Sequence, residues 1–216
     1  AVVLPTRAWR QRAVGAIARR FIRLGGVPLI VRGAERLAIA GPVIVAANHA
    51  SYLDAIVLIA ALPRDVSFVA KRELADVAVV RLFLNRLGTA FVERVDPKRG
   101  VEDTGRLADA VREGRSLLMF PEGTFGRAPG LRPFRMGSFV VAAQTGTPVV
   151  PVVIRGTRSI LRDGSWFPRR GTISVTIGEP LVPSGTDWSA ALGLRDATRA
   201  EILRWCGEPD LQRIAG

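Results

Sequence analysis

Apolar and polar positions change their spacing repeatedly along the chain. From residue 29 onward, short apolar runs of strand length alternate with longer stretches in which apolar residues recur at helical spacing. The predicted strands cover 43–47, 66–71, 89–94, 116–120, 148–154 and 172–178, and the predicted helices cover 52–62, 73–87, 101–113, 134–144 and 187–205. This alternation predicts an α/β fold, with a mostly parallel central sheet flanked by helices.

The N-terminal stretch 6–24 is predicted to form a basic amphipathic helix, since it holds six arginines and no acidic residue. On a helical wheel its apolar side carries Ala13, Val14, Ile17, Phe21 and Leu24, and its basic side carries Arg12, Arg19, Arg20 and Arg23. The segregation is imperfect because Arg10 falls inside the apolar arc. Two interpretations fit this pattern equally: a helix at a membrane interface, and a helix packed on the domain with a solvated basic face.

The net charge of +12 comes almost entirely from arginine, since Lys71 and Lys98 are the only lysines. Such a surface predicts an anionic partner, either nucleic acid or the headgroup layer of a membrane. Aromatic residues make up only 6% of the chain and Tyr52 is the sole tyrosine, which argues against a platform for stacking bases. No apolar run approaches the roughly 18 to 20 residues needed to cross a bilayer. These features favour a membrane surface over nucleic acid.

His49 is the only histidine and Cys206 the only cysteine, so no protein zinc site and no internal disulfide are expected. The predicted strand 43–47 is followed by Asn48 and then by His49, and Asp54 comes five residues after His49. A carboxylate at this position can fix the imidazole tautomer and leave the other ring nitrogen as a base. Alternatively, the polar residues here cap the next helix and Asp54 stabilises its dipole. The pair taken alone favours the capping interpretation, because a histidine and an aspartate at this spacing often occur by chance.

Five short blocks favour the catalytic interpretation. They are NHASYLD (48–54), FVAKREL (68–74), GTAFVER (88–94), FPEGTFGR (120–127) and TPVVPVVI (147–154). In this order and at these spacings they resemble the blocks of the glycerolipid acyltransferase family, which includes the lysophosphatidate and glycerol-3-phosphate acyltransferases. The resemblance covers residues 40–180.

The resemblance implies that His49 is the general base and Asp54 its orienting partner. It further implies direct attack of an acceptor hydroxyl on an acyl thioester, without an acyl-enzyme. Glu122, Gly123 and Thr124 lie in FPEGTFGR, and the resemblance implies that this block contacts the glycerol part of the acceptor. The chain is therefore expected to be an O-acyltransferase that acts on a lysophospholipid, most simply 1-acylglycerol-3-phosphate.

Two cations are implied in holding the acceptor's phosphate, namely Lys71 and Arg94, although either could instead form a surface salt bridge. One position departs from the family, which often has an arginine directly after EGT. Here Phe125 occupies that position and Arg127 comes two residues later. Either Arg127 supplies the charge for bidentate phosphate binding, or the acceptor is not a free phosphate monoester.

The remaining expectations follow from the same resemblance and from the charge. The chain divides into a membrane-interface segment, 1–28, and an acyltransferase domain, 29–216. No metal and no cofactor are expected, because the co-substrate is the thioester of coenzyme A or of an acyl carrier protein. The predicted location is peripheral, on the cytoplasmic face of a membrane, with a phospholipid surface and no nucleic acid as partner. A nucleic-acid-binding module and a thioester hydrolase are the alternatives.

Overall fold

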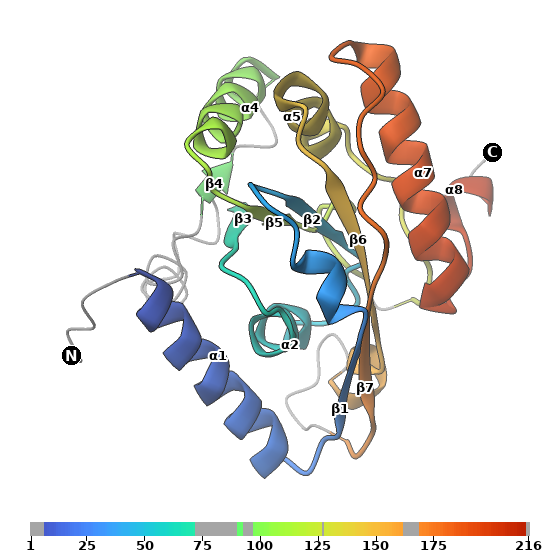
Figure 1. Ribbon diagram of the computed structural model, residues 1–216. Coiled ribbons are helices and arrows are strands. Elements are labelled where there is room, and N and C mark those ends of the chain that lie inside the picture. The colour runs from blue at the N-terminus through green and yellow to red at the C-terminus, as the bar shows by residue number, and fades with distance from the viewer. Residues whose placement is uncertain (1–6, 72–89, 93–96, 127, 162–168, 215–216) are drawn as a thin grey trace.

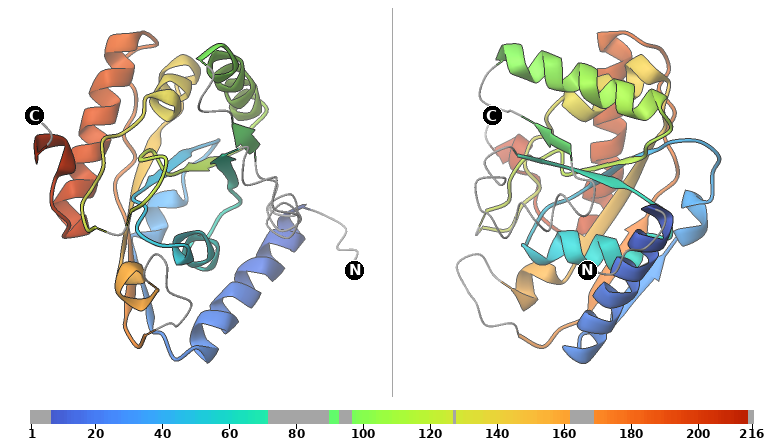
Figure 2. Two further views of the ribbon diagram at one scale, coloured as in Figure 1. Left: turned by 180° about the vertical axis from the view of Figure 1, so that it is seen from behind. Right: turned by 90° about the vertical axis from the view of Figure 1, so that its left-hand side faces the viewer.

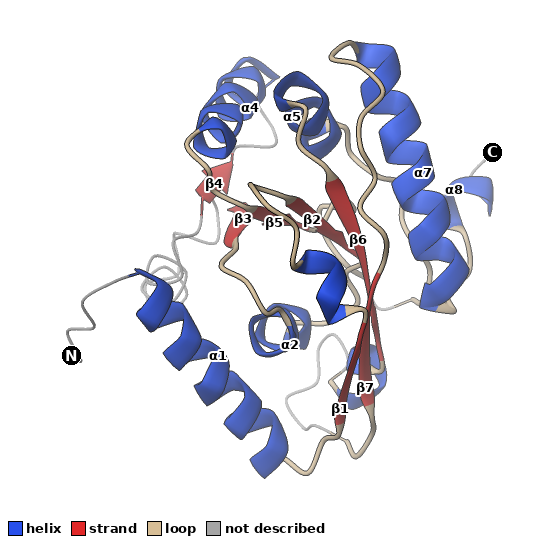
Figure 3. Ribbon diagram, in the orientation of Figure 1, coloured by secondary structure: helices blue, strands red, loops and turns tan. Residues whose placement is uncertain are grey.

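The computed structural model describes residues 7–71, 90–92, 97–126, 128–161 and 169–214, without the side chains of 7–12, 70–71, 90–92, 97–101 and 213–214. Within these residues seven strands form one sheet, in the order β1-β7-β6-β2-β5-β3-β4. The strands are β1 (Leu29–Arg32), β2 (Ile44–Ala47), β3 (Ser67–Lys71), β4 (Ala90–Val92), β5 (Leu117–Met119), β6 (Val149–Arg155) and β7 (Ile173–Ile177). Every neighbouring pair is parallel except β6 and β7, so the prediction of a mostly parallel α/β sheet is confirmed (Figure 3).

Helices cover both faces of this sheet (Figures 1 and 2). They are α1 (Arg7–Leu24), α2 (Leu53–Ala61), α4 (Pro97–Arg112), α5 (Gly137–Thr145), α6 (Thr157–Ile160), α7 (Trp188–Cys206) and α8 (Leu211–Ile214), with the 3-10 helix η1 (Ala34–Leu37). The helices α1 and α2 lie on one face, and α4, α5 and α7 lie on the other. The predicted helix 73–87 lies outside the described residues.

Two apolar cores explain why the central strands read as unbroken apolar runs. In β2, Val45 and Ala47 join the core beneath α1 and α2, while Ile44 and Ala46 join the core beneath α5 and α7. Alternate side chains of a strand point to opposite faces, so a strand covered on both sides must be apolar at every position. The edge strand β1 has no such signature and was not predicted, because its short run alternates between half-buried and exposed positions.

The helix α1 packs on the domain through a narrow face of small and apolar residues. Ala18 and Ile22 are buried in the core, and Gly15 lies so close to Ile59 that an added Cβ would be 3.2 Å from the Ile59 carbonyl oxygen. Arg19, predicted on the solvated basic face, instead donates from Nη1 to the Ala60 carbonyl at 3.0 Å. The basic residues of α1 therefore do not all lie on one free face.

A second apolar face of α1 remains uncovered in the structure. Ile17, Phe21 and Leu24 are 68%, 64% and 76% exposed. Their spacing of four and three residues places them in one stripe along the helix. The domain-packing face and the exposed stripe thus coexist on one helix. Among the described residues, no helix combines the length and apolar character needed to span a membrane.

Candidate active site

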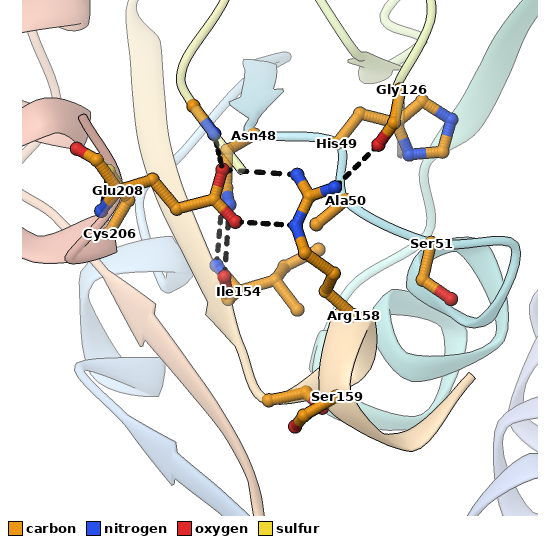
Figure 4. Close-up of polar contacts among 12 residues, drawn as sticks. Asn48, His49, Ala50, Ser51, Gly126, Ile154, Arg158, Ser159, Cys206 and Glu208 are labelled. Carbon is orange, nitrogen blue, oxygen red and sulfur yellow. Dashed lines mark hydrogen bonds and ion pairs between the residues drawn. The ribbon is translucent and has the colours of Figure 1, made fainter. Parts of the chain in front are cut away.

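His49 lies where the central strand β2 ends and the chain turns into α2. In a mostly parallel sheet, the carboxyl ends of the strands form the edge at which binding sites gather. Asn48 fixes the backbone at this point through a two-way contact with β6: its Nδ2 donates to the Ile154 carbonyl at 2.9 Å, and its Oδ1 accepts from the Ile154 amide at 2.7 Å (Figure 4). Asn48 is buried, so its amide group replaces the ladder hydrogen bonds that a strand would make there. Sequence reasoning gave Asn48 no role.

The structure brings His49 and Asp54 into contact. His49 Nδ1 lies 2.9 Å from Asp54 Oδ2, and the same oxygen accepts from the amides of Ala50 at 2.6 Å and Ser51 at 2.8 Å. Asp54 is fully buried, while the His49 side chain is 17% exposed. One carboxylate oxygen therefore orders the turn before α2 and also orients the imidazole. If Nδ1 carries the proton, Nε2 is the ring nitrogen with the free lone pair, and the role of His49 as a base stays a prediction.

Two aromatic rings hold the His49 ring. Phe120 stacks on it with ring centroids 4.1 Å apart, and Phe125 meets it edge-on at 4.5 Å. Phe125 also meets Tyr52 edge-on at 4.8 Å. The residue that departs from the family pattern thus lies against the imidazole, where it provides apolar surface and no charge. Sequence reasoning found Phe125 through that departure and gave Phe120 no role.

Glu122 is buried beneath the same site and faces two backbone amides. Its Oε1 accepts from the His49 amide at 2.7 Å, and its Oε2 accepts from the Arg132 amide at 2.9 Å. Burial raises the pKa of Glu122 to about 7, against the two amide hydrogen bonds that lower it. Glu122 therefore connects its own block, FPEGTFGR, to the block NHASYLD through a buried hydrogen bond. Its contact with the acceptor stays a prediction.

The other predicted binding residues are placed only in part. Gly123 forms the turn after Glu122 with a φ of 80°, and Thr124 next to it is exposed. Lys71 ends β3, but its side chain is not described. Arg94 and Arg127 lie outside the described residues.

The buried Glu122 makes stability depend on pH. Its ordinary pKa of 4.5 rises to about 7 in the folded chain, so between these values the folded state binds more protons than the unfolded state. The free energy of unfolding is expected to fall as the pH rises from about 4.5 to about 7, by on the order of 3 kcal/mol from this group. Urea unfolding at pH 5 and pH 7.5 measures the change. The Glu122→Gln variant should lose most of it, and an unchanged difference would contradict the assignment.

Comparison with known proteins agrees with this geometry. Residues 28–155, more than half of the chain, match the family described as Acyltransferase. The chain is a member of the Acyltransferase family. The chain is 33% identical over 147 residues to a chloroplastic 1-acyl-sn-glycerol-3-phosphate acyltransferase of Brassica napus, covering 68% of the chain and 42% of the relative. It is 32% identical over 173 residues to human 1-acyl-sn-glycerol-3-phosphate acyltransferase beta, covering 80% of the chain and 62% of the relative.

A solved structure shares the fold of this chain. The 1-acyl-sn-glycerophosphate acyltransferase PlsC from Thermotoga maritima superposes with a TM-score of 0.77 at 25% sequence identity, over 90% of this chain and 77% of that chain. The curated relatives are longer, and the match spans about half of their length, 42% and 62% for the two named above.

Proposed function

We propose that this acyltransferase moves a fatty acyl group from an acyl thioester to the free hydroxyl of a lysophospholipid, 1-acylglycerol-3-phosphate. The observation that carries the proposal is the contact of His49 Nδ1 with the buried Asp54 carboxylate, which leaves Nε2 as a base. The names of the relatives support this choice of acceptor.

The proposed reaction uses general-base catalysis and passes through one tetrahedral intermediate. His49 Nε2 takes the proton of the acceptor hydroxyl while its oxygen forms a bond to the thioester carbonyl carbon. The tetrahedral intermediate then expels the thiolate, which takes the proton from the imidazolium, so that an ester and a free thiol result. Asp54 stabilises the imidazolium between these steps, because its carboxylate lies next to Nδ1.

An acyl-enzyme is not part of the proposal. Ser51 Oγ donates to the Leu161 carbonyl at 2.8 Å and is fully buried. Cys206 is buried as well, and desolvation raises the pKa of its thiol, which disfavours the thiolate nucleophile. Direct transfer needs neither group.

The acceptor is proposed to bind beside the block FPEGTFGR. In this proposal Glu122, Gly123 and Thr124 hold its glycerol part, and Lys71, Arg94 and Arg127 hold its phosphate. No metal or cofactor takes part; the donor is a co-substrate thioester of coenzyme A or of an acyl carrier protein.

A product assay tests the proposed function. The purified protein is incubated with an acyl thioester and a panel of lysophospholipids, and the products are identified by mass spectrometry. Formation of a diacyl product from 1-acylglycerol-3-phosphate is expected. Release of free fatty acid without any acceptor would assign a thioester hydrolase instead, and no consumption of thioester with any acceptor would overturn the proposal.

We further propose that the protein is peripheral, on the cytoplasmic face of a membrane, and that it does not bind nucleic acid. The lysolipid and its product both reside in a bilayer. The exposed stripe of Ile17, Phe21 and Leu24 gives α1 an apolar surface, and Arg20 and Arg23 are exposed on the same helix. An apolar stripe with adjacent arginines is the pattern of a helix that lies in the interface of an anionic membrane.

The triple variant Ile17→Ser, Phe21→Ser, Leu24→Ser is expected to lose vesicle binding without losing the fold. Wild-type protein should co-sediment with anionic vesicles at low salt and dissociate as salt rises, since screening weakens the attraction of the arginines. Turnover of a monomeric short-chain acceptor should survive in the variant.

The matched control is Val182→Ser with Trp188→Ser, which removes exposed apolar surface elsewhere on the chain. This control should bind vesicles as wild type does. Wild-type protein that stays in the supernatant with anionic vesicles, or that shifts duplex DNA in a gel at matched salt, would contradict the membrane proposal.

A further inference from the structure

An ion pair joins α6 to the chain segment that follows α7. Arg158 Nε lies 2.9 Å from Glu208 Oε1, and Nη2 donates to Oε2 at 3.1 Å, so the contact is bidentate. Both side chains are 19% exposed, and both residues lie outside the residues 28–155 that match the family. A bidentate, largely buried pair fixes geometry more tightly than an exposed one. We refer to Arg158 and Glu208 as the clasp.

Each member of the clasp also holds the backbone of the loop that follows Thr124. Arg158 Nη1 donates to the Gly126 carbonyl at 2.5 Å, and Glu208 Oε2 accepts from the Gly130 amide at 2.7 Å. Figure 4 shows the Arg158 guanidinium between the Glu208 carboxylate and Gly126. The clasp therefore hydrogen-bonds to the loop backbone at Gly126 and at Gly130, four residues apart.

The segment after α7, which carries Glu208, is itself held in place by hydrogen bonds and an ion pair. The Leu131 amide donates to the Pro209 carbonyl at 2.8 Å, and the Leu211 amide donates to the Leu131 carbonyl at 3.1 Å. Arg199 pairs with Asp210 at 2.6 Å, which anchors the same segment to α7. The C-terminal part of the chain is thus fastened to the residues directly after the loop.

The loop is linked to the catalytic histidine on its other side. Phe125, which precedes Gly126, meets the His49 ring edge-on, and Glu122 accepts from the His49 amide. Thr124 lies between these two residues. A displacement of the Gly126 carbonyl would therefore move the residues that border the imidazole.

We propose that Arg158 and Glu208 are positioning residues that set the place of the Gly123–Gly126 turn relative to His49, and so the binding of the acceptor. The inference rests on the proposed function, because that turn carries the proposed contacts to the glycerol part of the acceptor. The C-terminal segment thereby acts on the active site through the clasp, without contributing a catalytic group.

The test compares Arg158→Met and Glu208→Ala with a matched control, Arg36→Met. Arg36 makes the same kinds of contact elsewhere: Nε lies 2.7 Å from Glu179 Oε1, and Nη1 donates to the Ile177 carbonyl at 2.7 Å. In both clasp variants the KM for the acceptor should rise between about tenfold and a hundredfold, with little change in the KM for the thioester. Arg158→Lys keeps the positive charge but cannot make the bidentate contact, so its acceptor KM should lie between those of wild type and Arg158→Met. Arg36→Met should leave both constants unchanged.

Amide hydrogen exchange provides a readout that does not depend on turnover. Exchange at the Gly130 amide should become faster in both clasp variants and stay at the wild-type rate in Arg36→Met. Clasp variants with unchanged acceptor KM, or with equal rises for both substrates, would overturn the inference. So would unchanged exchange at Gly130. A wild-type protein without acyl transfer would instead overturn the proposed function, and the exchange experiment would still decide whether the clasp holds the loop.

Discussion

The His49→Ala variant is expected to lose acyl transfer by a factor of about 10² to 10⁴, the usual effect of removing a general base. His49 is the only imidazole in the chain, and in the proposed mechanism its Nε2 is the base, because Nδ1 contacts Asp54. The Ser51 hydroxyl donates to Leu161 and Cys206 is buried, so neither replaces it. Initial rates with an acyl thioester and 1-acylglycerol-3-phosphate measure the loss.

The fold of His49→Ala should survive, because the His49 side chain is partly exposed and its contacts to Asp54 and Phe120 are local. Circular dichroism and the thermal midpoint of the variant check this point. A folded variant with near wild-type turnover would contradict the mechanism.

The Asp54→Asn variant is expected to lose nearly as much rate as His49→Ala, and the geometry explains why. All three hydrogen bonds to the carboxylate converge on Oδ2, and Oδ1 is buried without a hydrogen-bond partner among the described residues. An asparagine whose oxygen takes the place of Oδ2 can accept from the Ala50 and Ser51 amides as before. The negative charge beside the imidazolium is lost, so the rate should fall while the fold is kept.

The Asp54→Ala variant separates this electrostatic role from the structural one. It leaves the buried amides of Ala50 and Ser51 without their acceptor, at a cost of about 1 to 3 kcal/mol for each unpaired group. Its thermal midpoint should therefore fall well below that of Asp54→Asn. If Asp54→Asn kept near wild-type rates, Asp54 would serve only the turn before α2.

The alternation of strands and helices was predictable because it depends on the spacing of apolar residues within short segments. The central strands lie between two helical layers, and β2 is apolar and buried at every position. The short helices η1, α6 and α8 escaped that reasoning, as did two further features. The edge strand β1 is short and half exposed, so it lacks the signature of a buried strand. The helix predicted from residue 134 begins at Gly137, because the Arg135 amide donates to the Pro121 carbonyl at 2.9 Å, away from the helix.

The His49–Asp54 pair could be predicted because its members are five residues apart, with His49 after β2 and Asp54 in the first turn of α2. The partners of Glu122 could not, since the amide of His49 is 73 positions away in the sequence. The block match placed Glu122 at the acceptor, whereas the structure gives both of its oxygens to backbone amides. Asn48 with Ile154, 106 positions apart, and the clasp, 50 positions apart, are equally invisible to local patterns.

Local patterns were enough to predict the α/β class, the basic N-terminal helix and the histidine–aspartate pair, because each depends on residues within a few positions of one another. Packing selects the face of α1 that the domain covers, since Gly15, Ala18 and Ile22 become a packing face only when α2 lies against them. The tertiary structure also decided which distant segments meet at the site. Strand order brings β2, β5 and β6 side by side, and their ends place Asn48, Glu122 and the clasp around His49. Such contacts depend on the order of strands in the sheet, which spacing along the chain does not record.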